Sequence, residues 1–291
     1  MRVFAALAAA LWNDGQNGAA NCEGSMDLGL NGKTALVTGA SRGIGLAITR
    51  ALLNEGVSVV MVARTADRLR QVAMELRKSI NQSSPVAVHP VVGDLGQRDE
   101  ATRIAQTAFA RLGHLDILIN NAGSSSTGPF FRLSDEDLVD AWQVKALGYL
   151  RLIRAVAPAM MAQRSGNIIM IAGSTSRTPT PEFLHGSMVN AALINFTRGI
   201  ARELAPYQVR INVISPGLTK IERLQSSIER EARQRQMSAE DAEKEHARAI
   251  PLHRLVSMDE IAALTLLLVS DQVPAITGEE IIVDGGSTPS I

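Results

Sequence analysis

The stretch TALVTGASRGIGLAITRAL, residues 34–52, joins a short apolar run to a helical pattern through a glycine-rich turn. Glycine is needed in such a turn because a Cβ would keep the backbone away from a bound pyrophosphate. The N–H groups at the start of the following helix then face the phosphates. A strand before the turn and a helix after it predict a dinucleotide-binding unit. The residues expected to line it are Gly39, Ser41, Arg42, Gly43, Ile44 and Gly45.

Similar apolar, β-branched runs recur along the whole chain, and amphipathic helical patterns such as residues 66–80 and 259–270 separate them. Each run is typical of a strand that is buried on both faces. Strict alternation of strand and helix implies a parallel sheet with helices on both sides. We predict a single doubly wound (Rossmann-type) α/β domain over residues 26–291, with a seven-stranded parallel sheet. The seven expected strands are residues 34–38, 57–62, 86–91, 116–120, 167–172, 209–214 and 280–284.

Residues 219–255 interrupt this alternation. They contain no strand pattern and are densely charged, with Glu and Arg spacings that suit one or two surface helices. A solvated helical decoration is one interpretation. Their place directly after the sixth strand favours the other, a helical lid over the substrate.

The first 25 residues share no pattern with the domain. A lone Arg2 and the run VFAALAAALW resemble a short secretory signal, but no clear cleavage site follows. A lipoprotein signal would need a small residue before Cys22, where Asn21 stands. We therefore expect residues 1–25 to be a disordered or mis-annotated leader, with Met26 as the natural start.

Charge balance and cysteine content narrow the class of protein. Lysine plus arginine equals aspartate plus glutamate at 29 each, so the chain has no electrostatic footprint for nucleic acid or an anionic membrane. A single cysteine rules out an intramolecular disulfide and makes a thiolate metal site implausible. We expect a cytoplasmic protein with a small-molecule substrate, and no metal, nucleic-acid or membrane partner.

The end of the second strand indicates which dinucleotide the chain prefers. An acid there would hold the ribose 2′-hydroxyl of NAD. Here Ala63 and Arg64 follow the strand, the first carboxylate is Asp67, and Arg42 lies in the turn. Two guanidinium groups suit the 2′-phosphate of NADP(H), which is the predicted cofactor. Ordinary surface arginines are the alternative interpretation.

Five short motifs occur in order between residues 38 and 286: TGASRGIG (38–45), GDL (93–95), NNAG (120–123), SPG (215–217) and ITGEEIIVDGG (276–286). Together they resemble the short-chain dehydrogenase/reductases, which use NAD(P)(H). The resemblance implies a homotetramer or homodimer built through helices around 134–162 and 186–206. It also implies that Asp94 and Leu95 flank the adenine, and that Asn121, Ala122 and Gly123 line the cofactor cleft.

The same resemblance implies four catalytic positions, and all four differ here. The family uses a tyrosine to transfer the proton, a lysine four residues later, a serine and an asparagine. This chain has Gly186, Asn190, Gly173 and Lys145 at those positions. Tyr149 and Tyr207 are the only tyrosines, and neither is well placed by sequence.

Three polar residues in the right region are candidates for a relocated site: Ser174, His185 and Lys145. Ser174 would bind a substrate oxygen, His185 would transfer a proton near neutral pH, and Lys145 would supply a cation to the cleft. We expect Ser174 and His185 to face the cleft from the loops between the fifth strand and the helix that follows it. A turn-forming serine, a solvated histidine and an exposed lysine are the alternative interpretations.

Two functions follow. The first is an NADP(H)-dependent oxidoreductase that acts on a carbonyl or alcohol with an atypical proton donor. The second is a cofactor-binding protein without redox turnover, such as a sensor, a partner subunit, or a lyase or isomerase.

Overall fold

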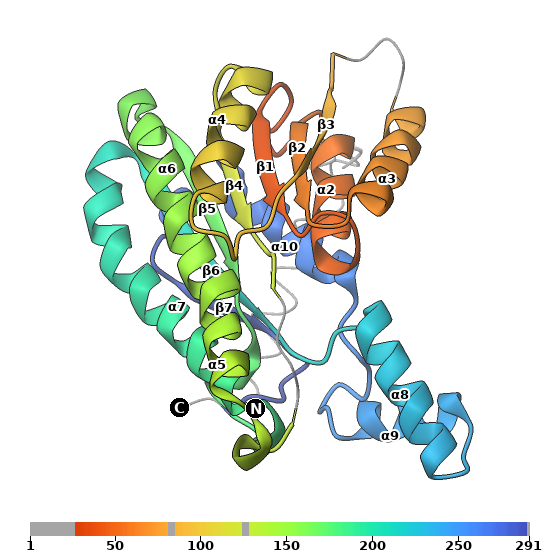
Figure 1. Ribbon diagram of the computed structural model, residues 1–291. Coiled ribbons are helices and arrows are strands. Elements are labelled where there is room, and N and C mark those ends of the chain that lie inside the picture. Colours follow the sequence, from red (N-terminus) through yellow and green to blue (C-terminus); the bar gives the residue numbers. More distant parts are fainter. Residues whose placement is uncertain (1–26, 81–84, 124–127, 290–291) are drawn as a thin grey trace, which may run out of the picture.

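A computed structural model describes residues 27–80, 85–123 and 128–289. The leader expected at residues 1–25, including Cys22, lies outside the described residues. Seven parallel strands form the centre of the molecule in the order β3-β2-β1-β4-β5-β6-β7, which confirms the predicted sheet (Figure 1). The strands are β1 (Thr34–Thr38), β2 (Ser58–Ala63), β3 (Val88–Val92), β4 (Ile117–Asn120), β5 (Gly166–Ile171), β6 (Val209–Pro216) and β7 (Glu280–Val283).

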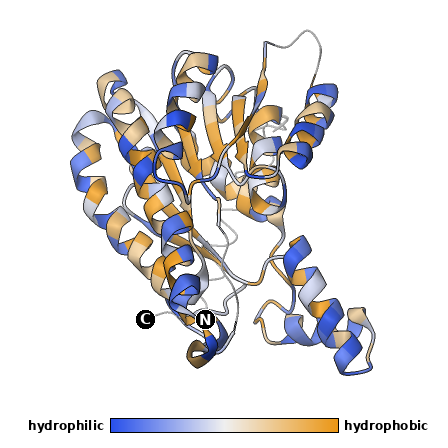
Figure 2. Ribbon diagram, viewed as in Figure 1, coloured by the Kyte–Doolittle hydropathy of each residue, from blue (hydrophilic) through white to orange (hydrophobic). Residues whose placement is uncertain are grey.

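Helices cover both faces of the sheet, and alternate residues of each strand serve the two cores. In β1, Leu36 joins one apolar cluster, whereas Ala35 and Val37 join the other. The strands are accordingly apolar along their length (Figure 2). The first cluster packs under α4 (Glu100–Leu112), α6 (Gly148–Gln163) and α7 (Leu184–Leu204). The second packs under α2 (Gly43–Asn54), α3 (Ala66–Ser79) and α10 (Met258–Val269).

The order of the strands reverses between β1 and β4. The chain moves outward through β2 and β3, returns to β4 beside β1, and then continues to β7. In an open α/β sheet, ligands bind at the carboxyl ends of the strands, where this reversal leaves a crevice. The fold therefore places the loops after β1, β4, β5 and β6 around one site.

The segment after β6 forms two helices, α8 (Glu222–Gln234) and α9 (Ala239–Arg248). They project from the body of the molecule at the lower right of Figure 1. A small apolar cluster of Ile228, Ala232 and Ala242 joins them to each other. At the base of the pair, Thr219 forms an isolated parallel bridge with Val256. That this helix pair acts as a lid stays a prediction.

Among the helices that the structure describes, none combines the length and the apolar character needed to cross a bilayer.

Candidate active site

The turn after β1 has the backbone that a phosphate site requires. Gly39 and Gly43 have φ angles of 67° and 58°, in the left-handed region that favours glycine. A Cβ on Gly45 would collide with the side-chain amide of Asn121 and with the carbonyl oxygen of Gly39. The N-cap residue of α2, Arg42, makes no side-chain cap. The first N–H groups of α2 are thus left for a ligand, as in dinucleotide sites.

The segment after β4 holds this turn in place. Asn121 Nδ2 donates to the carbonyl oxygen of Thr38 at 2.9 Å. The backbone N–H groups of Asn121 and Ala122 both donate to Thr38 Oγ1, at 2.9 and 3.0 Å. Sequence reasoning assigned Asn121 and Ala122 to the cofactor cleft. In the structure, Asn121 and Ala122 also connect the end of β4 to the turn. A shift of either residue would therefore move the turn.

Two exposed arginines lie in and beside the turn, where the ribose 2′-phosphate of the cofactor was expected. Arg42 lies at its centre and Arg64 directly after β2. Neither forms an ion pair with the acidic residues that the structure describes. Their guanidinium groups therefore remain available for an anion, although a role for either one stays a prediction.

Asp94 and Leu95, expected beside the adenine, lie in the loop after β3. Leu95 is buried, and a Cβ on Gly148 of α6 would come within 2.9 Å of its Cβ. Asp94 Oδ1 accepts a hydrogen bond from the N–H of Gly96 at 3.0 Å. The Leu95 side chain thus packs in the core, and Asp94 shapes the loop that borders the cleft.

One further arginine, which no sequence motif indicated, links the turn to the helix pair α8–α9. Arg68 of α3 donates through Nε to the carbonyl oxygen of Ser41 at 3.4 Å. Its Nη2 lies 3.0 Å from Glu222 Oε1, at the first residue of α8. Both side chains are largely exposed, so this ion pair contributes little stability but connects the two ends of the cleft.

Lys145 reaches into the cleft from an irregular helix. Residues Trp142–Leu147 form a π-helical segment between α5 (Asp135–Ala141) and α6. Such segments within α-helices are frequently found at functional sites. Lys145 Nζ donates to the carbonyl oxygen of Ala172 at 2.9 Å and to Asn190 Oδ1 at 2.8 Å. A Cβ on Gly123 would lie 3.8 Å from Lys145 Cδ, so the side chain passes directly by the NNAG segment.

At the contact between Lys145 and Asn190, the two residue types expected from the family have changed places. Lys145 stands where an asparagine was expected and Asn190 where a lysine was expected. Because the two side chains touch, the exchange keeps one ammonium and one amide in the same small volume. The structure thus brings together two positions that the sequence presented as separate losses.

The environment of the ammonium alters its acidity. Lys145 is half-buried as a residue, and its ammonium lies among neutral groups. Burial, assisted by the positive charge of Arg223 on α8, lowers the pKa of Lys145 to about 7. A lysine in this position therefore exchanges its proton in the range where enzymes operate.

Thr175, in the loop after β5, is hydrogen-bonded to the pair formed by Lys145 and Asn190. Asn190 Nδ2 donates to Thr175 Oγ1 at 3.1 Å. Ser174, the expected oxygen-binding residue, is only 8% exposed, and its carbonyl accepts the N–H groups of Arg177 and Thr178. Sequence reasoning missed Thr175, although it lies beside Ser174 in the same loop. A Cβ on Gly173 would lie 2.8 Å from Asn190 Nδ2, so a larger side chain there would push against this amide.

Phe183 fills the space beside Gly186, where the tyrosine was expected. A Cβ on Gly186 would collide with the Phe183 ring. His185 was expected in the loop before α7, but it lies in the first turn of that helix. It is fully buried, and its ring centroid lies 5.5 Å from that of Phe183. The position is thus closed by an aromatic ring, and a proton-transfer role of His185 stays a prediction.

Comparison with known proteins places this geometry in a family. The family profile described as "Enoyl-(Acyl carrier protein) reductase" matches residues 39–288, which is most of the chain. The "NADPH-dependent reductase BacG" of Bacillus subtilis is 32% identical over 89% of this chain and 99% of its own length. The chain belongs to the short-chain dehydrogenase/reductase family.

Other family members differ in what they act on. L-sorbose reductase from Gluconobacter frateurii, solved with NADPH and L-sorbose, has a TM-score of 0.87 at 29% identity. The match covers 91% of this chain and 100% of the reductase. A 2,3-dihydro-2,3-dihydroxybenzoate dehydrogenase of Bacillus subtilis is 31% identical over 89% of this chain and 97% of its own length. Membership of the short-chain dehydrogenase/reductases therefore leaves the substrate open.

Neither tyrosine of the chain can take the place of the family's proton donor. Tyr149 is fully buried in the core under α6, and this burial raises the pKa of its hydroxyl well above the usual value. Tyr207 lies just before β6 begins, at the opposite edge of the sheet from the cleft. The structure thus supports the expectation that neither is well placed.

A buried carboxylate fixes the loop that carries Ser174 and Thr175. The side chain of Glu280 in β7 is only 1% exposed. It accepts hydrogen bonds from Ser176 Oγ at 3.2 Å and Ser215 Oγ at 2.8 Å. Arg177 completes the arrangement with Nε at 2.8 Å and Nη2 at 2.7 Å. This network anchors the loop after β5 to β6 and β7, which sequence reasoning had not foreseen.

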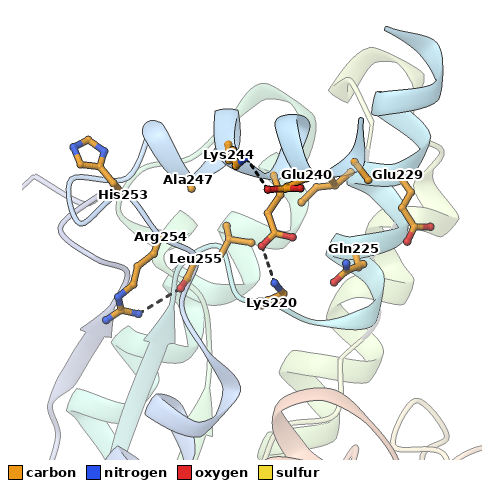
Figure 3. A pocket seen from close by; sticks show the side chains of 12 residues that line it. Lys220, Gln225, Glu229, Glu240, Lys244, Ala247, His253, Arg254 and Leu255 are labelled. Carbon is orange, nitrogen blue, oxygen red and sulfur yellow. Dashed lines mark hydrogen bonds and ion pairs between the residues drawn. The ribbon is translucent and has the colours of Figure 1, made fainter. Parts of the chain in front are cut away.

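A separate cavity of about 480 Å³ lies within the helix pair (Figure 3). Two ion pairs join charged side chains on its walls: Lys220 with Glu243 and Lys244 with Glu240, both at 2.7 Å. The side chains around Lys145 are not among those that line it. The cavity is thus a feature of the helix pair α8–α9, separate from the group around Lys145.

Proposed function

We propose that the protein is an NADP(H)-dependent oxidoreductase that interconverts a carbonyl and an alcohol, with a proton donor other than the family's tyrosine. The observation that carries this proposal is the contact between Lys145 and Asn190. It keeps an ammonium beside Gly123 although the usual lysine is gone. Two relatives that use NADPH by name, the reductase BacG and L-sorbose reductase, support the choice of cofactor.

The residues of the turn fit such a cofactor. The backbone around Gly39, Gly43 and Gly45 would hold the pyrophosphate, and Arg42 with Arg64 would hold the 2′-phosphate. When bound, the reduced nicotinamide supplies a hydride to the carbonyl carbon of the substrate. The candidate groups for the substrate oxygen are Ser174, His185 and Lys145, together with Thr175.

A cofactor-binding protein without redox turnover is the less favoured function. The named relatives are reductases and dehydrogenases, and the chain has an ammonium and hydroxyl groups in the region where a carbonyl oxygen would lie. Loss of the tyrosine also leaves hydride transfer possible, because that step depends chiefly on orientation.

A cofactor titration followed by a substrate screen tests the proposal. NADPH and NADH binding would be measured by the fluorescence of the reduced nicotinamide. NADPH oxidation would then be followed over ketones, aldehydes, sugars and 3-oxoacyl thioesters. We expect tight NADPH binding and turnover with at least one of these classes. Tight binding with no turnover on any class would favour the function without redox chemistry.

We also propose a cytoplasmic homodimer or homotetramer. Val139, Trp142 and Leu147 on the segment from α5 to α6, and Met188 on α7, are exposed apolar residues. α5 and α7 contact each other and lie side by side in Figure 1. Burial of these side chains against a second copy would remove an apolar patch from water. Light scattering coupled to size-exclusion chromatography would show the assembly, and a monomer would contradict it.

A further inference from the structure

Three side chains from three elements form one hydrogen-bonded chain at the carboxyl edge of the sheet. Lys145 comes from the π-helical segment, Asn190 from α7 and Thr175 from the loop after β5. An ammonium carries three N–H donors. Two of those on Lys145 are used by Ala172 and Asn190. Within residues 27–80, 85–123 and 128–289, no acceptor takes the third.

The direction of each hydrogen bond in this chain is determined by the ammonium. Since an ammonium only donates, Asn190 must turn its Oδ1 toward Lys145, and its Nδ2 then donates to Thr175 Oγ1. The hydroxyl of Thr175 is consequently an acceptor toward Asn190. Its own hydrogen points elsewhere, and Thr175 is partly exposed on the loop that borders the cleft. Two donors, one ammonium and one hydroxyl, thus come from the same hydrogen-bonded group.

We propose that Lys145 is the proton donor of this enzyme, that Thr175 binds the substrate oxygen, and that Asn190 aligns the two. The inference rests on the proposed oxidoreductase function and assigns the roles within it. The lysine stem runs beside Gly123, since a Cβ there would be in ordinary van der Waals contact with Lys145 Cδ, at 3.8 Å. Asn190 acts here as a positioning residue, since both of its bonds are to other side chains.

The proton balance of the step is simple. When the carbonyl carbon accepts a hydride, the C=O π bond breaks and its electron pair moves to oxygen. The Lys145 Nζ–H bond then breaks and an O–H bond forms, which leaves a neutral amine. Solvent returns a proton to the amine. In alcohol oxidation the neutral amine accepts the hydroxyl proton while the hydride moves from carbon to NADP⁺.

Lys145 suits this role better than His185. The histidine is fully buried and packs against Phe183, so it has no exposed surface through which to reach a substrate oxygen. Burial gives Lys145 a pKa of about 7, near the optimum for an acid or base at neutral pH. Arg223 from α8 is the charged group that lowers this pKa further, whereas the contacting groups from β5 and α7, Ala172 and Asn190, are neutral.

The first test measures the acidity of Lys145 without any turnover. The chain has five lysines, Lys33, Lys78, Lys145, Lys220 and Lys244, so ¹³C-dimethylation gives a simple NMR spectrum. The Lys145→Arg variant would identify the signal of Lys145. We expect this signal to titrate near pH 7 in the protein without cofactor. Titration of the Lys145 signal at the ordinary pKa of a lysine side chain would overturn the proposal.

The second test measures turnover on a carbonyl that the screen identifies. Lys145→Gln should lower kcat by about 10² to 10⁴ at neutral pH with little change in NADPH affinity. The reductive rate of the wild type should fall as pH rises through 7, and the variant should lose this dependence. Thr175→Val should lower kcat/KM about tenfold or more, and Thr175→Ser should restore it. Lys78→Gln, at an exposed position of α3, is the matched control.

The outcomes separate the two proposals. If the wild type turns over NADPH and Lys145→Gln leaves kcat within a few-fold, the donor role is wrong and the oxidoreductase function stands. If the wild type reduces no carbonyl, the oxidoreductase function fails and the donor role fails with it. Should Lys145→Gln not fold, the NMR titration of the wild type still decides the acidity on which the donor role depends.

Discussion

The turn after β1 and the loop after β5 meet at one edge of the sheet, but they tolerate change to different degrees. The turn would bind a phosphate through its backbone, and Gly39 and Gly45 leave no room for a Cβ. The loop after β5 and the helices beside it act through side chains. There an ammonium reaches the cleft from α7 in the family's pattern and from the π-helical segment here. An added side chain disturbs a site made of backbone, whereas a site made of side chains can receive the same chemical group from another element.

Different interactions hold the two regions in place. The largest effect that we expect on stability tests this difference. The turn is held by hydrogen bonds to Asn121 and Thr38, whereas the loop after β5 depends on the buried carboxylate of Glu280. Arg177→Met would leave that carboxylate with two serine hydroxyls only. We expect a loss of about 3 kcal/mol in the free energy of unfolding, as for a broken buried pair. Urea denaturation would measure it.

A matched surface pair provides the control. Arg254 and Glu260 also form a two-bond ion pair, but both side chains are more than one-third exposed. Arg254→Met should therefore cost less than about 1 kcal/mol. Equal losses in the two variants would show that Glu280 does not anchor the loop.

The second prediction compares one glycine from each region. Gly45→Ala would place a methyl group against backbone and the Asn121 amide, and neither neighbour has room to move. We expect about 1 to 3 kcal/mol of destabilisation and a loss of NADPH binding. Gly173→Ala meets only the end of the Asn190 side chain, so it should leave NADPH binding intact and reduce kcat. Thermal melts and cofactor titrations of both variants would check this. NADPH binding that survives Gly45→Ala would contradict the view of the turn as a rigid backbone site.

The smallest expected effect concerns the choice of cofactor. Arg64→Asp replaces a cation by an anion beside the expected 2′-phosphate, so NADPH binding should weaken at least about tenfold, or roughly 1.4 kcal/mol. NADH has no 2′-phosphate, and its affinity should change far less. Parallel titrations of both cofactors would measure the difference. If the unmodified protein bound NADPH and NADH equally well, the assignment of Arg42 and Arg64 would be wrong.

The strands and the turn could be predicted from the sequence because the signals for them are local. Apolar β-branched runs, and glycines at a fixed spacing, report on neighbouring residues of one chain segment. The contacts within the candidate site could not be predicted in this way. Lys145 and Asn190 are 45 residues apart, and Ser176 and Glu280 are 104 apart. Only the packing of α7 against the π-helical segment shows that the missing lysine at position 190 and the missing asparagine at position 145 are replaced by each other.

The position of Phe183 bears on the order in which mutations can accumulate. A tyrosine introduced at Gly186 collides with the Phe183 ring, and a serine at Gly173 crowds the Asn190 amide. A lysine at Asn190 would face the ammonium of Lys145 at hydrogen-bond distance, and the two charges would repel. Each of these three substitutions toward the family's pattern thus meets a neighbouring side chain that would have to move or change. This is sign epistasis, in which a mutation is harmful unless another precedes it. The altered site would therefore persist even where selection favoured the family's tyrosine-based chemistry.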